Sequence, residues 1–301
     1  IAGSNVFGGN VYMQTGGSNI VFQSDAGTLV LGGSLQYIGS LTSARTFNFF
    51  GGGNTVVSGP ILFSSVAPLN VGKYGSGTLS LNGANTYAGS TLIYGGTLSG
   101  NGVIASPVTV SSGAALAPGG GSIGTLTINN ALTNNGTFVI RLNKTGSALT
   151  NDNVKGVSTL ALGGALQLVM SGDLITAGDS FKIFAATNYR NFITAITPAT
   201  PGTNLLWNTN NLAVNGTLSV SLGTIKPRVG NISFAGSNLV LGGSGGAAGY
   251  GFSILASTNL TAPVTNWLVI GTGVCDSNGN FIVTNGLNMT NLWQFYLVRM
   301  P

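Results

Sequence analysis

The chain has 301 residues, and only 5% of them are charged, whereas a soluble globular domain usually carries about 25%. It contains ten Lys and Arg, five acidic residues and no His, which excludes His-dependent triads and zinc sites. Its 49 Gly residues would weaken helix interiors, so the composition favours an uncharged, all-β protein.

A short unit recurs through the first two thirds of the chain: a turn residue followed by alternating apolar and small residues. A period of two indicates a β-strand with Leu, Ile or Val facing a core and Thr or Ser facing outward. The unit stands at residues 27–31, 77–81, 96–98, 124–128, 158–162 and 216–220. We expect each of these segments to form one short strand.

The spacing of these strands favours a parallel β-solenoid over residues 1–223. The intervals between units are irregular but suit coils of about 19 to 25 residues, so that about ten coils would fill this length. Between the strands lie clusters of Gly and Asn, at 51–54, 82–85 and 134–136, which predict corners with positive φ. In stacked coils the backbone ladders hold the fold, so charged side chains become dispensable.

Residues 75–98 read GSGTLSLNGANTYAGSTLIYGGTL and resemble the autotransporter-associated β-strand repeat of bacterial secreted passengers. Both Gly-Thr-Leu units and the Asn-Thr-Tyr between them stand at the spacing of that family. Residues 115–128 resemble the segment that closes such arrays, and residues 154–222 resemble the same proteins more loosely. The resemblance implies a right-handed parallel β-helix and a secreted or surface location.

The repeat pattern stops at residues 222–228, where Pro227 lies between two basic residues, and this predicts a linker. We therefore place a second domain at residues 224–301 and expect a small antiparallel β-sandwich there. Its strands are expected at 231–234, 238–241, 250–256, 267–271, 281–284 and 293–299. The order of residues from Tyr250 to Pro301 resembles a C-terminal module of secreted Verrucomicrobia-type proteins, which implies an extracellular or envelope address.

Residues 276–280 read DSNGN and offer the start of a calcium loop. An EF-hand needs Gly at the sixth position and Glu at the twelfth, and these positions carry Phe281 and Leu287. We therefore interpret the segment as a hairpin turn, with Gly279 in the turn.

We expect structural roles for the other acidic residues as well. Asp173 and Asp179 could form a carboxylate pair for glycoside hydrolysis, but we expect Asp179 to accept backbone hydrogen bonds ahead of the next strand. An acid and a base lie closest together at residues 151–155, where we expect a solvated turn. The sequence thus predicts no catalytic, cofactor-binding or metal-binding residues, no cofactor and no enzymatic activity.

Aromatic residues near the N-terminus offer a strip for stacking sugars: Tyr12, Phe22, Tyr37, Phe47, Phe49, Phe50 and Phe63. Because only alternate positions of a strand face outward, we expect most of them to lie in the core. Thr125 and Thr127 resemble one rung of an ice-binding surface, but the pair does not repeat from coil to coil.

Several partners are not expected. The basic residues are scattered rather than gathered in a stripe, which argues against nucleic-acid binding. No run of about 18 apolar residues occurs, so no membrane-spanning helix is expected. The single Cys275 has no partner for an internal disulfide, and we expect a buried thiol.

Our leading hypothesis is a non-enzymatic, extracellular structural protein whose copies join head to tail through β-edge contacts into a fibre or surface layer. The terminal coils of a solenoid expose unpaired backbone groups, and residues 1–38 carry Asp25 as their only charge, so no charged cap is evident. Contacts of that type propagate instead of closing. The alternative is a monomeric surface adhesin or glycan-binding protein, and a polysaccharide-active β-helix enzyme is the third hypothesis.

Overall fold

The computed structural model describes residues 3–14, 19–38, 43–62, 67–223, 227–246, 249–286 and 294–300. It divides into two compact units, Ile1–Ser221 and Leu222–Pro301, here called the N-terminal and C-terminal units. In the described residues, helix is confined to α1 (Leu212–Asn215) and the 3-10 turn η1 (Val264–Asn266). The all-β prediction is confirmed.

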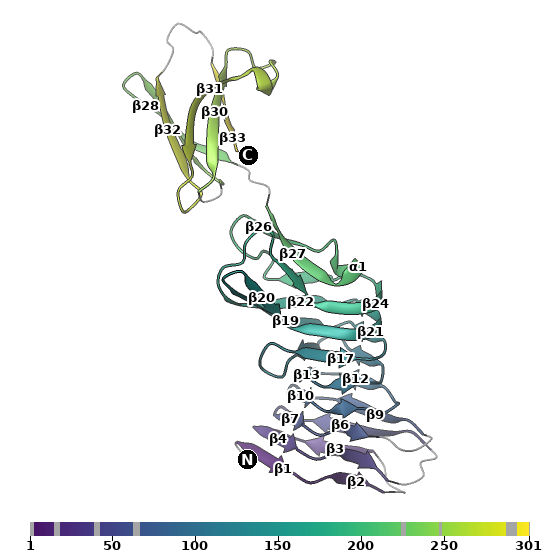
Figure 1. The fold of residues 1–301 in the computed structure, drawn as a ribbon. Helices are drawn as coiled ribbons and strands as arrows, with labels where there is room; N and C mark the ends of the chain where they lie inside the picture. The colour runs from purple at the N-terminus through teal and green to yellow at the C-terminus, as the bar shows by residue number, and fades with distance from the viewer. Residues whose placement is uncertain are drawn as a thin grey trace. The chain divides into compact units, whose positions relative to one another are not determined.

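The N-terminal unit is a parallel β-solenoid of about seven turns (Figure 1). Most coils contribute three strands, one to each wall, so that strands three apart in number lie side by side. The longest wall runs β1 (Ser4–Phe7), β4 (Thr28–Leu31), β7 (Asn54–Val57), β10 (Thr78–Leu81), β13 (Thr97–Gly100), β16 (Ala115–Pro118), β19 (Thr137–Thr145), β22 (Ala165–Gly172) and β25 (Ala195–Thr197). We call it the ten-stranded sheet, because the hairpin strand β20 (Ala148–Asn151) also joins it beside β19.

Two further walls complete the coils. One begins with a three-stranded sheet of β2 (Val11–Met13), β5 (Leu35–Tyr37) and β8 (Ile61–Leu62). An eleven-stranded sheet contains β3 (Ile20–Gln23), β6 (Arg45–Phe50), β9 (Leu69–Lys73), β12 (Thr91–Ile93), β15 (Val108–Val110), β18 (Leu132–Asn134), β21 (Asn153–Leu162), β17 (Thr125–Ile128), β14 (Val103–Ile104), β11 (Ala84–Asn85) and β24 (Phe184–Arg190). The coils are fewer than the ten expected, because strands from β19 onward are longer and a hairpin extends one coil.

Apolar residues that pair between coils form columns inside the solenoid. In the ten-stranded sheet, Leu79 pairs with Leu98, which pairs with Leu116, and all three are fully buried. In these three coils, the Leu of one strand therefore lies on the Leu of the next coil. Burial of apolar surface contributes about 25 cal/mol per Å², so this column is a major source of stability.

Glycines also stack on glycines, at a corner where the coils approach closely. A Cβ on Gly59 would lie 2.2 Å from the carbonyl oxygen of Gly33, and one on Gly83 would lie 2.4 Å from that of Gly59. Gly102 stands in the same relation to Gly83. No other residue fits this column, which accounts for part of the high glycine content.

The asparagines at the predicted corners do not adopt the positive φ angles that the sequence analysis expected. Among the described residues, only Asn191 and Asn204 are non-glycine residues with positive φ, and both lie outside the predicted corners. The corner asparagines instead bond to the next coil: Asn54 Oδ1 accepts a hydrogen bond from Thr78 N (3.0 Å), and Asn82 Oδ1 accepts one from Asn101 N (3.2 Å). Their amides extend the inter-coil ladder through the corners.

The Asn-Thr-Tyr of the repeat is part of the same inter-coil bonding. Asn85 is buried; its Oδ1 accepts a hydrogen bond from Ile61 N (2.9 Å), and its Nδ2 donates to the carbonyls of Gly83 and Val103. It thereby joins three successive coils. Tyr87 is fully buried, and its Oη lies 2.6 Å from the hydroxyl of Thr91.

The C-terminal end of the solenoid core is covered by a small antiparallel sheet of β23 (Ser180–Lys182), β27 (Thr217–Leu222) and β26 (Leu205–Asn208). Phe181 and Leu218 from this sheet and Leu212 from α1 are buried against the core. The unit at 216–220, expected to form a coil strand, therefore belongs to a cap. Its alternating pattern is the same, but β27 pairs antiparallel with β23.

The C-terminal unit is a small antiparallel sandwich, as predicted. One sheet contains β28 (Arg228–Ala235), β29 (Asn238–Ser244) and β32 (Phe281–Gly286), and the other β31 (Leu268–Val274), β30 (Gly251–Ser257) and β33 (Phe295–Arg299). Leu241, Ile254 and Cys275 lie in the core that the two sheets share. Residue 293, where the last strand was expected to begin, lies outside the described residues.

Replacing Asn85 tests the inter-coil bonding. Asn85→Ala removes three hydrogen bonds and leaves Ile61 N–H without its acceptor, so we expect a loss of roughly 2–4 kcal/mol in the free energy of unfolding. Urea unfolding followed by circular dichroism measures it. Asn129→Ala, at an exposed site in the same solenoid, should change stability by less than about 0.5 kcal/mol. Equal losses of stability in the two variants would contradict the role of Asn85 in inter-coil bonding.

The Tyr87 phenol gives a prediction for alkaline pH. Burial raises the pKa of Tyr87 from 10.0 to about 12, although hydrogen bonds to Thr91 and Ser106 oppose the shift. The neutral phenol thus stabilises the fold below pH 10, and this contribution is lost as the pH rises toward 12. We expect urea unfolding to show wild type losing about 2 kcal/mol more than Tyr87→Phe between these pH values. If the free energy of unfolding of wild type and of Tyr87→Phe fell equally over this pH range, the prediction would be refuted.

Candidate functional site

The carboxylates that the sequence singled out are engaged in local structure. Asp179 Oδ2 accepts hydrogen bonds from Thr176 N (2.7 Å) and from Lys144 Nζ (2.8 Å). Burial opposes ionisation of Asp179, but the bonds from Lys144 and Thr176 hold its pKa below the usual value. Asp173 Oδ2 accepts a hydrogen bond from Gly146 N (2.7 Å). The two carboxylates therefore bind different partners, and both fix loops at the edge of the sheet.

Asp276 closes the turn between β31 and β32. Its Oδ1 accepts hydrogen bonds from the backbone N–H groups of Asn278 and Asn280, both at 2.8 Å, and its Oδ2 accepts one from Asn280 Nδ2. The backbone bond from Asn280 is the main cause of a lowered pKa at Asp276. Both oxygens are thus used within the hairpin turn. Among the described residues, no group of three or more His, Cys, Asp or Glu is placed to hold a metal ion.

The solvated turn expected at residues 151–155 is wrong for Asp152, which is fully buried. Asp152 Oδ2 accepts hydrogen bonds from Arg141 Nε (2.8 Å) and Arg141 N (2.9 Å), and Oδ1 accepts one from Gly124 N (2.9 Å). The guanidinium of Arg141 also donates to the carbonyl of Pro118. The Arg141–Asp152 pair thus binds both ends of the glycine-rich loop at 118–124, through Pro118 and Gly124. These contacts join segments that are far apart in sequence.

Lys73 is a second buried charge that the sequence did not reveal. Its side chain is only 2% exposed, and Nζ donates hydrogen bonds to the carbonyls of Tyr74 and Gly75. Burial lowers the pKa of this ammonium group. The contacts are all to backbone at the corner after β9, so Lys73 holds that corner in shape.

A groove of about 420 Å³ lies on the outward face of the ten-stranded sheet. Two rows of small side chains line it, one of Thr28, Asn54, Thr78 and Thr97 and the other of Val56, Ser80, Ser99 and Ala117. Gly120, Gly121 and Arg141 line it as well. Among its described lining residues, Arg141 carries the only charge, and Asp152 neutralises it.

The N-terminal aromatic residues lie mostly in the core, as expected. Tyr37, Phe47 and Phe49 are buried, and Phe22 stacks on Phe49 with ring centroids 5.1 Å apart. Tyr12 and Phe50 are exposed, and Phe63 lies outside the described residues. The chain thus offers no continuous sugar-stacking strip among those residues.

An aromatic ladder that sequence reasoning missed lies on the outer surface and consists of Phe50, Tyr74 and Tyr94. The ring centroids of Phe50 and Tyr74 are 4.6 Å apart, and those of Tyr74 and Tyr94 are 4.7 Å apart, with interplanar angles of 6° and 15°. The three residues stand at the same position of successive coils. Because the rings stack face to face, the middle ring has no free face for a sugar.

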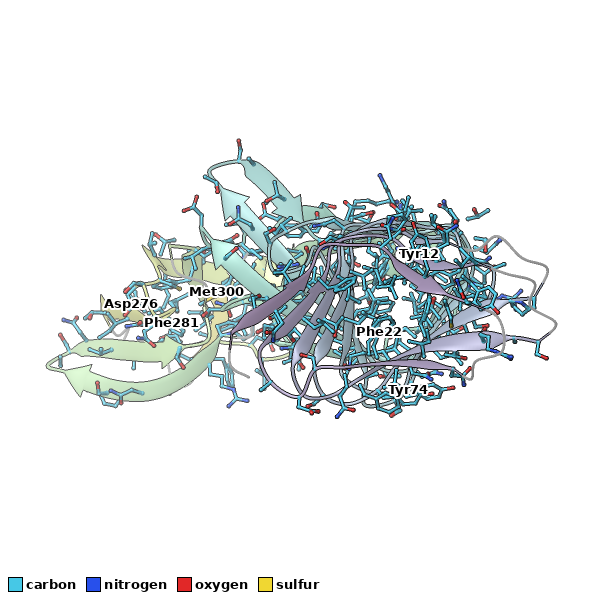
Figure 2. The ribbon with its side chains drawn as sticks, turned by 90° about the horizontal axis from the view of Figure 1, so that it is seen from below. Tyr12, Phe22, Tyr74, Asp276, Phe281 and Met300 are labelled. Atoms are coloured by element: carbon cyan, nitrogen blue, oxygen red, sulfur yellow. The ribbon has the colours of Figure 1, made fainter. Side chains whose placement is uncertain are left out.

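The first coil, made of β1, β2 and β3, has strand partners on one side only among the described residues. All four side chains of β1 are exposed; Val6 is 71% exposed, and Phe7, Tyr12 and Val21 are also exposed. Figure 2 looks onto this end of the solenoid, with Tyr12 on the coil and Phe22 inside it. The edge carries neither Lys nor Pro, the residues that usually protect such edges.

The comparison with known families agrees with this architecture. Residues 72–99 match the passenger-associated-transport-repeat family, and they span β10 to β13 with Asn85 and Tyr87. No curated protein matches the chain significantly. Within the described residues, no helix has the length and apolar character needed to cross a membrane. The matched repeat and the β-solenoid together fit a secreted or surface passenger domain of the autotransporter type.

Breaking the Arg141–Asp152 pair tests its structural role. Asp152→Ala removes the carboxylate from a half-buried guanidinium, which keeps its bond to the Pro118 carbonyl, and it leaves two backbone N–H groups without an acceptor. We therefore expect a loss of about 3–5 kcal/mol in the free energy of unfolding. Hydrogen exchange at the Gly124 amide should accelerate as the loop opens. Asp25→Ala, at an exposed site, serves as the control and should leave both measurements unchanged. An unaltered Gly124 amide in Asp152→Ala would refute this role of the pair.

Proposed function

We propose that this chain is a non-enzymatic structural subunit of a secreted or surface passenger, joined end to end through its solenoid edges into an extracellular fibre or layer. The observation that carries the proposal is the edge of the first coil, which has exposed apolar side chains and no strand partner on its outer side among the described residues. Unprotected edge strands are templates for pairing with another chain. Pairing would cover the exposed Val6 and Phe7 and would satisfy the backbone groups of β1 that have no strand partner among the residues described.

The ten-stranded sheet supplies both halves of a head-to-tail contact. β1 stands at one end of this sheet, and β25 stands at the other, with a strand partner on one side only in the described part of the chain. A parallel bridge from β25 of one copy to β1 of the next would continue the sheet in register. The cap formed by β23, β27 and β26 covers the rest of that end, so the contact is narrower than a full coil.

The absence of enzymatic activity is part of this proposal. It rests on the engagement of the described carboxylates. Asp152 pairs with Arg141, Asp179 with Lys144, and Asp276 bonds within its own turn. Asp173 accepts a hydrogen bond from Gly146 N and Asp25 accepts one from Gln23 Nε2. Catalysis by a carboxylate pair needs two such groups facing one cleft. The outer groove carries no carboxylate among its described lining residues.

Glycan binding is the second candidate function, and the outer groove favours it. Thr28, Thr78 and Thr97 lie at equivalent positions of different coils in its first row, which suits an extended, uncharged polysaccharide. Binding to a glycan array that Thr78→Val and Thr97→Val abolish would support this function over assembly. The groove lacks an aromatic ring among its described lining residues, which weakens the case.

Charging the open edge tests the assembly. Val6→Lys and Val21→Lys place ammonium groups on β1 and β3, where they should repel an incoming strand. We expect sedimentation velocity and negative-stain microscopy to show elongated assemblies of the wild type, and the double variant to raise the dissociation constant at least about tenfold. Val274→Lys, exposed on β31 of the C-terminal unit, is the control for added charge and should still assemble.

Two outcomes would overturn the proposal. Monodisperse monomers of the wild type at high concentration would exclude assembly. Closed dimers joined at their first coils would exclude head-to-tail growth, because such contacts do not propagate.

A further inference from the structure

Tyr74 and Tyr94 hold two phenols against each other on the surface of adjacent coils. Their ring centroids are 4.7 Å apart at an interplanar angle of 15°. Tyr94 is 48% exposed and Tyr74 is half-buried, and Figure 2 shows Tyr74 at the outer rim of the coils. Both rings are therefore open to small reagents in solution.

The backbone fixes this arrangement. Tyr94 N donates a hydrogen bond to the carbonyl of Lys73 (2.9 Å), and Tyr74 N donates one to that of Phe49 (2.7 Å). Tyr74 directly follows β9 and Tyr94 directly follows β12, and these two strands pair in parallel. The stacking is thus set by the coil spacing, and it persists as long as the solenoid is folded.

The remaining tyrosines of the N-terminal unit are placed differently. Tyr37 and Tyr87 are buried, and Tyr12 is exposed without a stacked ring among the described residues. Tyr189 is half-buried, and its hydroxyl bonds to backbone groups of Ala186 and Phe184. Phe50 covers the other face of Tyr74, and a phenyl ring cannot form a phenoxyl radical. A radical on Tyr74 therefore has Tyr94 as its one stacked phenol among the described residues.

We propose that Tyr74 and Tyr94 are a site of oxidative coupling, in which a peroxide-driven one-electron oxidant joins them as dityrosine and links two coils covalently. Each phenol loses one electron and its hydroxyl proton, giving two tyrosyl radicals. The radicals form a carbon–carbon bond between the ring positions next to each oxygen, and the hydrogen on each joined carbon moves to oxygen. Overall, two tyrosines and one hydrogen peroxide give dityrosine and two waters.

Proximity is the physical basis of the selectivity. Two groups held in contact react as an intramolecular pair, which replaces a collision between chains. The product would close a covalent loop across neighbouring coils and restrict the unfolded chain. The proposal does not depend on the assembly of copies, since both phenols belong to one chain.

The test treats dilute, folded protein with hydrogen peroxide and a haem peroxidase. We expect dityrosine fluorescence and a product that runs as a monomer on a denaturing gel. A protease that cuts at Leu79 and Leu81 should release the peptides of Tyr74 and Tyr94 as one joined species, lighter by two hydrogens. The same treatment in urea should give at least about tenfold less of this species, because the proximity is lost.

Matched variants decide the assignment. Tyr74→Phe and Tyr94→Phe keep a stacked ring but remove one phenol, so each should abolish the joined species while preserving the circular dichroism spectrum. Tyr12→Phe removes another exposed phenol and should leave the species unchanged. Cross-links that form only between chains, or a yield of joined peptides as high in urea as in the folded protein, would overturn the proposal.

Discussion

Backbone hydrogen bonds between successive coils, formed in strict register, are the interaction on which the rest of this solenoid depends. They hold equivalent positions of neighbouring coils at the spacing of paired strands, so each side chain lies directly on its counterpart. Leu79 thus packs on Leu98. Position 83 accepts only glycine, because the carbonyl of Gly59 occupies the space that a side chain would need. A sequence that must stack on itself in this way needs repeated small and apolar residues and has little use for charge.

The few polar groups inside the solenoid serve the same ladder. Asn85 bonds to the coils on both sides of its own, and Asn54 carries the bonding through a corner. Lys73 and Asp152 are buried charges, yet both bind backbone groups of turns and loops. Their role is to complete backbone bonding where strands end, which explains why so few ionisable residues suffice for a chain of 301 residues.

The surfaces of this fold that could serve a function consist of side chains that repeat from coil to coil on the outside of the solenoid. The in-register stacking that builds the core also aligns Thr78 with Thr97 in the outer groove and Tyr74 with Tyr94 in the aromatic ladder. It leaves the edge strands β1, β2 and β3 of the first coil with a strand partner on one side only among the described residues. Binding, cross-linking and assembly therefore draw on periodic surfaces, whereas a typical enzyme draws on one cluster of side chains.

The candidate surfaces were only partly predictable. Core positions such as Phe47 and Phe49 followed from alternation along one strand, and the turn at Asp276 followed from its local sequence. The aromatic ladder was missed because Tyr74 and Tyr94 lie on different coils, and their alignment depends on the number of residues between them. The sequence predicts a solvated turn at Asp152, because its partner Arg141 belongs to a neighbouring strand and the pairing is not visible in the local sequence.

The sequence by itself determined the all-β class, the repeating strand of Gly-Thr-Leu type, the solenoid and the separate C-terminal sandwich. These follow from period-two alternation and turn residues, which act over a few neighbouring positions. The tertiary structure decided the number of coils, the antiparallel cap that includes Leu218, and the inter-coil partners of Asn54 and Asn85. Each of these depends on the register between coils of unequal length, and that register is fixed only when the whole stack closes its hydrogen bonds.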